Sequence, residues 1–336
     1  MLQARVVITN HIFNFFCISP SRIPRISRIL APCCPLTSCV YKKYTMPTER
    51  TRSGLTHALS RLDALPAMPI IAQKLLALQL DTAKGEAQLL TLIEQDPQIS
   101  AKLISLANSP VMGVKRKICT VPDAAMLLGL NQVKSVSIGI ATMSTFSRLP
   151  VSSYFSPQDL WLHSLTIAIT MHTLSAYMPG DIRPRPEQIY LAGLLHDIGF
   201  MAIHHMDNKA SDLLHHQLRL QPKRPIVEIE LQILGLSHCH IGAQLARQWH
   251  LPEEIVNVLD YHHAPYVDKI SDRNPMARMV NVAEKLLPNF GITEFCGTDI
   301  TEREWQELGI NPAHTDELIN TTNELALQLA QIADVF

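Results

Sequence analysis

The sequence predicts an all-α fold, and three observations carry the prediction. Only 13 of the 336 residues are glycine, and 47% are apolar, which is enough to bury a substantial core. Long stretches are rich in Leu, Ala, Ile, Gln and Glu, and together these residues favour helices. Apolar residues recur at intervals of three and four, and no stretch alternates convincingly between apolar and polar side chains as a half-buried strand does. We therefore expect helices packed on helices and no sheet.

The first 45 residues differ in composition from the rest of the chain. They contain six basic residues, no acidic residue and four of the seven cysteines. Three interpretations are open: a translated upstream region before a true start at Met46, a targeting peptide, or a membrane-binding arm. No apolar run in this segment reaches the roughly 18 residues that a membrane span needs. We favour a start at Met46 and expect residues 1–45 to be a basic extension outside the fold.

A first helical lobe is expected over residues 55–149. Apolar side chains recur at helical spacing from Ile71 to Leu78. Asp96 precedes a proline and predicts a helix start, because its carboxylate can cap free N–H groups while proline suits the first helical position. Thr120, two residues before another proline, predicts a second start of this kind. The sequence therefore predicts several short amphipathic helices here.

A second helical bundle is expected over residues 156–336, after a linker that begins at Pro150. Ser156 stands before a proline and has Asp159 in the following turn, so we expect it to cap the first helix of this bundle. The two lobes together account for the chain after the basic extension.

The charge of the chain bears on its partners. The net charge is -1 and the isoelectric point is near 6.9, so no general basic field draws the chain to nucleic acid or to an anionic membrane. The run Lys115 to Lys117 is a candidate nucleic-acid contact, although three charges in a loop are more often a solvated turn. Cys119, Cys239 and Cys296 show no paired spacing, which fits a reducing compartment, and we expect a cytoplasmic protein.

The strongest chemical signal is the adjacent pair His196 and Asp197. We expect this pair near the end of a helix that Gly199 closes. Further histidines and a carboxylate stand on other expected helices, and these are His163, His238, His262, His263 and Glu284. Such side chains from several helices are what an interior iron, manganese or zinc site requires, because each helix can project only one or two ligands inward. Two neighbouring metal ions could share Asp197 as a bridge.

The alternative reading is that each histidine is individually capped or faces solvent. For any single histidine this reading is the stronger one. We expect it to hold for the surplus histidines His204, His205, His215 and His216, because the last pair lies in a polar stretch that can face water.

Several segments resemble the conserved blocks of the HDOD family, from Leu65 to about Pro265. The blocks that resemble its first half are Leu65-Pro66-Ala67-Met68-Pro69, Ile93-Glu94-Gln95-Asp96-Pro97, Leu106-Ala107-Asn108-Ser109-Pro110 and Leu127-Leu128-Gly129-Leu130. Those that resemble its second half are Trp161-Leu162-His163-Ser164, Gly193-Leu194-Leu195-His196-Asp197-Ile198-Gly199, His238-Cys239-His240-Ile241-Gly242-Ala243, Trp249-His250-Leu251-Pro252 and His262-His263. Together these motifs are highly specific.

The resemblance implies an HD-type helical core with an upstream helical lobe, in a stand-alone bacterial member that acts in signal transduction. It also implies metal ligands, because the HDOD family is related to two-metal HD phosphohydrolases. The positions that match their ligands are His163, His196, Asp197, His238, His262 and His263. Glu284 matches the position of the last ligand, which is an Asp in those enzymes. The carboxylate is kept, but its side chain is longer by one methylene. One or two ions of iron, manganese or zinc are implied.

Two departures from the enzymatic relatives weigh against catalysis. In the cyclic-dinucleotide hydrolases of the HD-GYP group a lysine suited to a phosphate charge follows the His-Asp-x-Gly motif, whereas Phe200 stands here. The Gly-Tyr-Pro signature of that group is replaced by Ala264-Pro265-Tyr266 after His263. We therefore expect a regulatory module that acts through a protein partner. The alternative is a metal-dependent phosphohydrolase or phosphodiesterase of a nucleotide or cyclic nucleotide, in which Asp197 is catalytic.

The compositional break predicts that residues 46–336 fold without the basic extension. We expect this fragment to be soluble and to melt within a few degrees of the full chain, as followed by circular dichroism. An insoluble fragment, or one that melts far below the full chain, would show that residues 1–45 belong to the fold.

Overall fold

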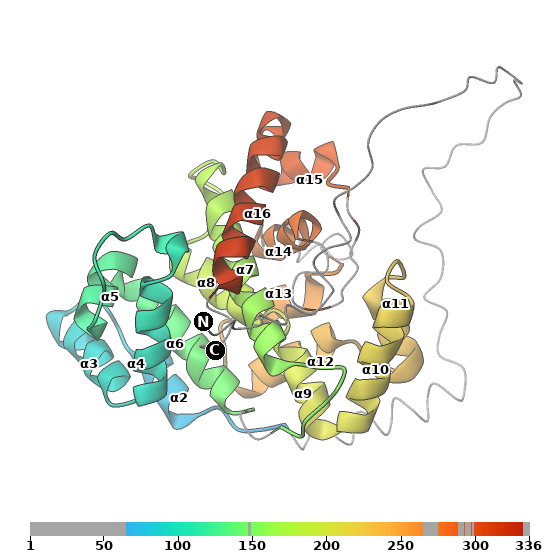
Figure 1. Ribbon diagram of the computed structural model, residues 1–336, viewed down its shortest axis with the longest axis horizontal. Coiled ribbons are helices and arrows are strands. Elements are labelled where there is room, and N and C mark those ends of the chain that lie inside the picture. The colour runs from blue at the N-terminus through green and yellow to red at the C-terminus, as the bar shows by residue number, and fades with distance from the viewer. Residues whose placement is uncertain are drawn as a thin grey trace, which may run out of the picture. The chain divides into compact units, whose positions relative to one another are not determined.

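The computed structural model describes residues 65–146, 149–264, 275–287, 292, 297 and 299–331. Within these ranges the chain forms helices and no strand, which confirms the all-α prediction (Figure 1). The predicted boundary at residue 45 and the expected start of the first lobe at residue 55 lie outside the described residues. The proposed domain limits therefore remain predictions.

The first lobe is a group of short helices. They are α2 (Ile70–Ala77), α3 (Ala83–Glu94), α4 (Pro97–Ala107), the 3-10 turn η2 (Pro110–Met112), α5 (Val121–Leu128) and α6 (Leu130–Ser144). The expected caps form: Asp96 accepts hydrogen bonds from the amides of Gln98 and Ile99, and Thr120 accepts one from Asp123. Figure 1 shows these helices gathered on one side of α7 and α8.

The second lobe contains the longer helices. They are α7 (Pro157–Ala176), α8 (Pro186–Leu195), α9 (Ile198–Met206), α10 (Asn208–Leu220), α11 (Ile226–Ile233), α12 (His238–Gln248), α13 (Glu253–Tyr261), α14 (Pro275–Leu286), α15 (Glu302–Glu307), the 3-10 turn η4 (Pro312–His314) and α16 (Thr315–Ala330). Ser156 caps α7 by accepting from the Asp159 amide, as expected. The helix α7 is buried on nearly all sides and packs against α8, α14 and α16, so it is the central helix of this lobe.

The two lobes pack directly on each other through α6 and α8. A Cβ atom at Gly139 of α6 would lie 2.9 Å from Leu194 Cδ1 of α8, so the missing side chain allows this close approach. The linker after Pro150 is also held in place. Ser152 hydrogen-bonds Asp212 of α10, and the Tyr154 carbonyl accepts a bond from Arg219 at 2.9 Å. The linker therefore joins two packed lobes rather than two independent bodies.

Among the described helices, no single one is both long and apolar enough to cross a membrane. The bent pair α5 and α6 reaches the required length and hydropathy only in combination, with an angle of 117° between its halves.

Gly193 of α8 sets the distance between α8 and the central helix. A Cβ atom there would lie 2.5 Å from Ala168 Cα and 2.8 Å from Ala168 N of α7. Such contacts are with backbone, which cannot rotate away, so the two helices would have to separate. His196 lies one turn further along the chain, and the α7 to α8 spacing therefore helps to place it.

We expect Gly193→Ala to lower the free energy of unfolding by about 2 kcal/mol, because overpacking outweighs the gain in helix propensity. Gly180→Ala is the matched control, since a Cβ atom there meets nothing within 4 Å. The control should change stability by less than about 0.5 kcal/mol in denaturant unfolding. Equal stability of the two variants would mean that α7 and α8 separate without cost.

Candidate metal centre

His196 and Asp197 occupy the junction between two helices. The helix α8 ends at Leu195, and α9 begins at Ile198. The expectation that Gly199 closes a helix is wrong, because Gly199 lies inside α9. Its role is close packing on α12: a Cβ atom at Gly199 would lie 2.0 Å from the His238 carbonyl oxygen. The glycine thus brings the His-Asp pair next to the helix that carries His238.

The Asp197 carboxylate is fully buried and lies between two groups of imidazoles. Its Oδ2 atom is 3.4 Å from His163 Nε2 of α7 and 3.2 Å from His196 Nε2. Its Oδ1 atom is 3.3 Å from His238 Nε2 of α12 and 3.5 Å from His262 Nε2, just after α13. Each carboxylate oxygen therefore faces its own pair of histidines.

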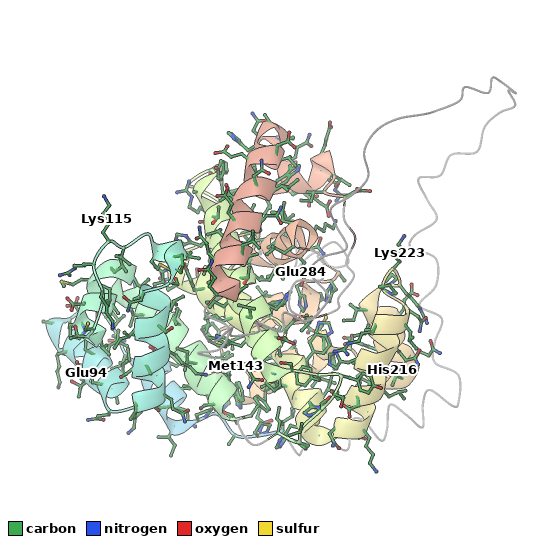
Figure 2. All side chains as sticks on the ribbon, viewed as in Figure 1. Glu94, Lys115, Met143, His216, Lys223 and Glu284 are labelled. Atoms are coloured by element: carbon green, nitrogen blue, oxygen red, sulfur yellow. The ribbon has the colours of Figure 1, made fainter. Side chains whose placement is uncertain are left out.

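Glu284 and His263 complete the cluster. Glu284 of α14 is buried, and its Oε1 lies 3.6 Å from His196 Nε2 while its Oε2 lies 3.7 Å from His263 Nδ1. In Figure 2 the Glu284 label lies among the helices of the second lobe, whereas Lys223 projects from the rim. The structure thus brings together all seven residues that the sequence predicted, from α7, α8, α12, α13, α14 and the turns beside them.

Hydrogen bonds at Nδ1, the ring nitrogen that faces away from Asp197, fix the orientation of three of the imidazole rings. Nδ1 of His196 donates to the Gly193 carbonyl at 2.8 Å, and Nδ1 of His262 donates to the Val258 and Leu259 carbonyls at 3.1 Å. Nδ1 of His238 meets the Glu230 carboxylate at 2.6 Å. Because carbonyl and carboxylate oxygens only accept, each Nδ1 carries the proton. The three Nε2 atoms therefore point at the Asp197 carboxylate, and those of His238 and His262 also at each other.

Ring nitrogens and carboxylate oxygens that converge in this way need protons or a metal cation between them. Neither Oδ1 nor Oδ2 of Asp197 accepts a regular hydrogen bond, and neither does Nε2 of His196 make one, although all three atoms are buried. Ligand atoms of His163, His196 and Glu284 lie within 4.8 Å of one another, and so do those of Asp197, His262, His263 and Glu284. The arrangement fits a transition-metal centre with imidazole and carboxylate ligands.

Electrostatics of the cluster agree with a cation site. Burial by itself raises the pKa of Asp197, but the charge of His196 and the close imidazoles of His163 and His238 hold that pKa well below its usual range. Burial lowers the pKa of His238, yet Cys239, Glu230 and Asp197 together raise it well above the ordinary value. Asp197 is therefore an anion that attracts positive charge, as a proton or as a metal ion.

Two residues of the centre were missed at the sequence level, Glu230 and Cys239. Both are buried, and Glu230 holds His238 in the manner of the carboxylates behind metal-bound imidazoles. The signal for Glu230 is its position on α11, because it shares the buried stripe of Ile226 and Ile229. Cys239 Sγ lies 3.5 Å from His238 Nε2, and although burial raises the thiol pKa, the charges of the neighbouring imidazoles lower it to about 7.

Phe200 occupies space beside the cluster. Its ring is fully buried and stacks on His238, with centroids 4.2 Å apart and planes inclined by 17°. The side chain that replaces the lysine of the HD-GYP group therefore packs against a candidate ligand instead of facing a substrate. The altered segment that follows His263 lies outside the described residues from position 265 onward.

Three of the surplus histidines are capped or reach solvent, as expected, and the buried His215 departs from the expectation. His205 is exposed and His216 is half-buried, whereas His204 and His215 are 1% and 5% exposed. His215 stacks on Phe155 at a centroid distance of 4.8 Å, and His204 Nε2 bonds the Pro150 carbonyl at 2.8 Å. The linker covers these two rings, and sequence alone gave no reason to expect that cover.

The candidate nucleic-acid loop is a solvated turn. Lys115 and Lys117 are exposed, and Figure 2 shows Lys115 projecting outward from the first lobe. Arg116 pairs at 3.4 Å with Asp123 at the start of α5, although its side chain is 72% exposed.

A two-lobed helical fold with a buried His/Asp cluster at the junction of two helices defines an HD-type module. The sequence model of the HDOD domain matches residues 65–265, and the chain belongs to the HDOD family. A curated relative, an uncharacterised protein of Treponema pallidum (strain Nichols), is 25% identical over 243 residues. The match covers 71% of this chain and 43% of that protein, so the chain spans less than half of that relative's length.

Solved structures support the same fold. A candidate signal transduction protein from Marinobacter aquaeolei VT8 matches with a TM-score of 0.71 and 24% identity, over 85% of this chain and 65% of that one. An HDOD domain protein of unknown function from Geobacter sulfurreducens matches with a TM-score of 0.63 and 24% identity, over 82% of this chain and 98% of that one. A candidate phosphohydrolase from Shewanella amazonensis SB2B matches with a TM-score of 0.57 and 22% identity, over 82% of this chain and 91% of that one.

The contact between Glu230 and His238 predicts an effect on metal affinity. We expect Glu230→Gln to weaken binding of zinc or manganese about 10- to 100-fold, because the ligand ring loses its charged partner. Glu228→Gln on the same helix is the control, since that side chain is 61% exposed, and it should leave affinity unchanged. The double change His196→Ala with Asp197→Ala should abolish stoichiometric metal. Calorimetric titration of metal-free protein measures all three, and equal affinities for the two glutamate variants would contradict the assignment.

Proposed function

We propose that this chain is a bacterial regulatory module that acts through a protein partner and holds an HD-type metal centre without efficient catalysis. Its ligands are His163, His196, Asp197, His238, His262, His263 and Glu284, and they hold one or two ions of iron, manganese or zinc. A bound ion would tie together helices that are far apart in the sequence. In this role the metal stabilises or senses a conformation that the partner recognises.

The observation that carries the proposal is the position of Phe200. A phosphohydrolase must hold the phosphate in line with cationic or amide donors, because positioning and charge stabilisation supply much of the rate. Here the place next to the His-Asp motif is filled by an apolar ring stacked on His238. The ring offers no hydrogen-bond donor, so this position cannot bind phosphate.

Two cations close to Glu284 in the sequence are already paired. Arg278 Nε lies 3.1 Å from Glu307 Oε2, and Lys285 hydrogen-bonds Glu304 on α15. All four side chains are largely or partly buried, so using either cation to bind a phosphate would first break its ion pair. These cations support the packing of α14 on α15 and do not favour a role in substrate binding.

The proposal that the chain acts through a protein partner rests on its family and on similar solved structures. The resemblance to the HDOD family implies a role in bacterial signal transduction, and the Marinobacter structure is described as a candidate signal transduction protein. A regulatory module of this kind needs a second protein to convert its state into an output.

The second candidate function is a metal-dependent phosphohydrolase or phosphodiesterase that acts on a nucleotide or cyclic nucleotide. The completeness of the cluster favours it, because all seven predicted ligands converge and Asp197 faces both groups of imidazoles. One Shewanella structure with this fold is described as a candidate phosphohydrolase. In this reading the histidines and carboxylates of the cluster would hold a metal that activates water, and Asp197 would be the catalytic residue.

Turnover measurements separate the two functions. We expect protein loaded with iron, manganese or zinc to hydrolyse cyclic dinucleotides, nucleotides and a generic phosphodiester no faster than its Asp197→Ala variant. Phe200→Lys is the informative companion, because it restores a cation at the position where the HD-GYP enzymes carry one. Robust hydrolysis by the wild type that is lost in Asp197→Ala would overturn the regulatory proposal in favour of the enzyme.

A further inference from the structure

Cys239 lies inside the cluster, although nothing in the ligand pattern of the HD relatives calls for sulfur there. It is the second residue of α12, directly after His238, and its side chain is buried. Its Sγ atom lies 3.5 Å from His238 Nε2 and 3.9 Å from His262 Nε2. Ligand atoms of His238, Cys239, His262 and His263 all lie within 4.8 Å of one another.

These distances resemble the edges of a tetrahedral zinc site. With Zn–N bonds of about 2.0–2.1 Å and a Zn–S bond of about 2.3 Å, tetrahedral angles place two nitrogens about 3.4 Å apart and nitrogen and sulfur about 3.6 Å apart. The Nε2 atoms of His238 and His262 are 3.2 Å apart, and sulfur is 3.5 and 3.9 Å from them. Asp197 Oδ1 lies 3.3 and 3.5 Å from the same two nitrogens. The sulfur and the carboxylate oxygen thus each lie at about the edge length of a tetrahedral site from the same two nitrogens.

A second observation points to a ligand at this place. Asp197 Oδ1 is buried and accepts no regular hydrogen bond, and it faces the same His238 and His262 nitrogens that the sulfur approaches. The Nδ1 atoms of both rings are bonded on their far sides, so the Nε2 atoms turn inward. Two ring nitrogens, a carboxylate oxygen and a thiol therefore converge at one place.

We propose that Cys239 is a thiolate ligand, which together with His238, His262 and Asp197 closes a zinc-selective, four-coordinate subsite. The inference rests on the proposed metal centre and adds the metal class and its coordination. On binding, zinc takes the sulfur lone pair and the thiol proton is released to solvent. Thiolate favours zinc over manganese, which prefers oxygen and nitrogen donors.

The two halves of the centre then differ in chemistry. The half around His163, His196, Glu284 and Asp197 Oδ2 offers only nitrogen and oxygen, whereas the half around Cys239 adds sulfur. Four protein ligands complete the tetrahedral coordination of a zinc ion and leave no position for water, which is the pattern of structural zinc sites. The closed subsite thus gives a reason for weak catalysis that is independent of Phe200.

The test is the absorption spectrum of the cobalt-loaded protein. The full chain is used with the cysteines before residue 45 removed, since these could bind cobalt themselves, by Cys17→Ser, Cys33→Ser, Cys34→Ser and Cys39→Ser. Cobalt is added to metal-free protein, and bound metal is counted by elemental analysis. We expect a near-ultraviolet sulfur-to-cobalt charge-transfer band that Cys239→Ser abolishes. The matched control Cys119→Ser changes the exposed cysteine and should keep the band.

Zinc affinity provides the second measurement. Cys239→Ser should weaken zinc binding at this subsite at least 10-fold and change manganese binding far less, because only the soft ligand is lost. If the variant fails to fold, X-ray absorption at the zinc edge of the wild-type protein decides, with one sulfur expected at about 2.3 Å.

The other outcomes separate the two proposals. Stoichiometric cobalt without a charge-transfer band would overturn the thiolate ligand and leave the metal centre standing. A band that persists in Cys239→Ser would assign the sulfur to another cysteine and overturn the inference. Failure of the wild-type chain to bind any metal would overturn the thiolate ligand and the proposed metal centre together.

Discussion

The carboxylate of Asp197 is completely buried, and a buried carboxylate is stable only where opposite charge or hydrogen-bond donors surround it. No lysine or arginine provides this among the ion pairs of Asp197 that the structure describes; imidazoles do. The four rings around it come from α7, the α8 to α9 junction, α12 and the end of α13. Each of these elements must therefore reach the same point, and this requirement constrains the packing of the second lobe.

Small residues make that convergence possible. Gly193 lets α8 approach the central helix, Gly199 lets α9 approach α12, and Gly139 lets the first lobe approach α8. At Gly193 and Gly199 a Cβ atom would meet backbone atoms of the neighbouring helix at 2.5 Å or less, so a larger residue would push these helices apart. These glycines thus act through packing at a distance from the histidines.

The surroundings of the cluster bear on what it can do. On one side Phe200 stacks on His238, and on another Cys239 approaches the same ring. Both side chains lie where an enzyme of this class would need a phosphate-binding group or an open coordination position. These neighbours are the reason why we propose that the interior holds an ion and does not turn over a substrate efficiently. The packing of the two lobes and the hydrogen bonds of the linker to α10 hold this interior in one arrangement.

The sequence by itself determined the helical class, the caps at Asp96, Thr120 and Ser156, and the residues that gather around Asp197. These follow from local rules: apolar spacing, capping chemistry, and motifs in which the ligand types stand at recognisable positions. Only the tertiary structure decided the rest. Nothing near Gly199 in the sequence indicates that its neighbour is α12, and the burial of His215 depends on a linker that precedes it by some sixty residues. Glu230 and Glu228 are alike in the sequence, and they differ because α11 turns one of them toward His238 and the other toward solvent. Local patterns record which face of a helix is buried, whereas the identity of the contacting helix depends on packing across the whole domain.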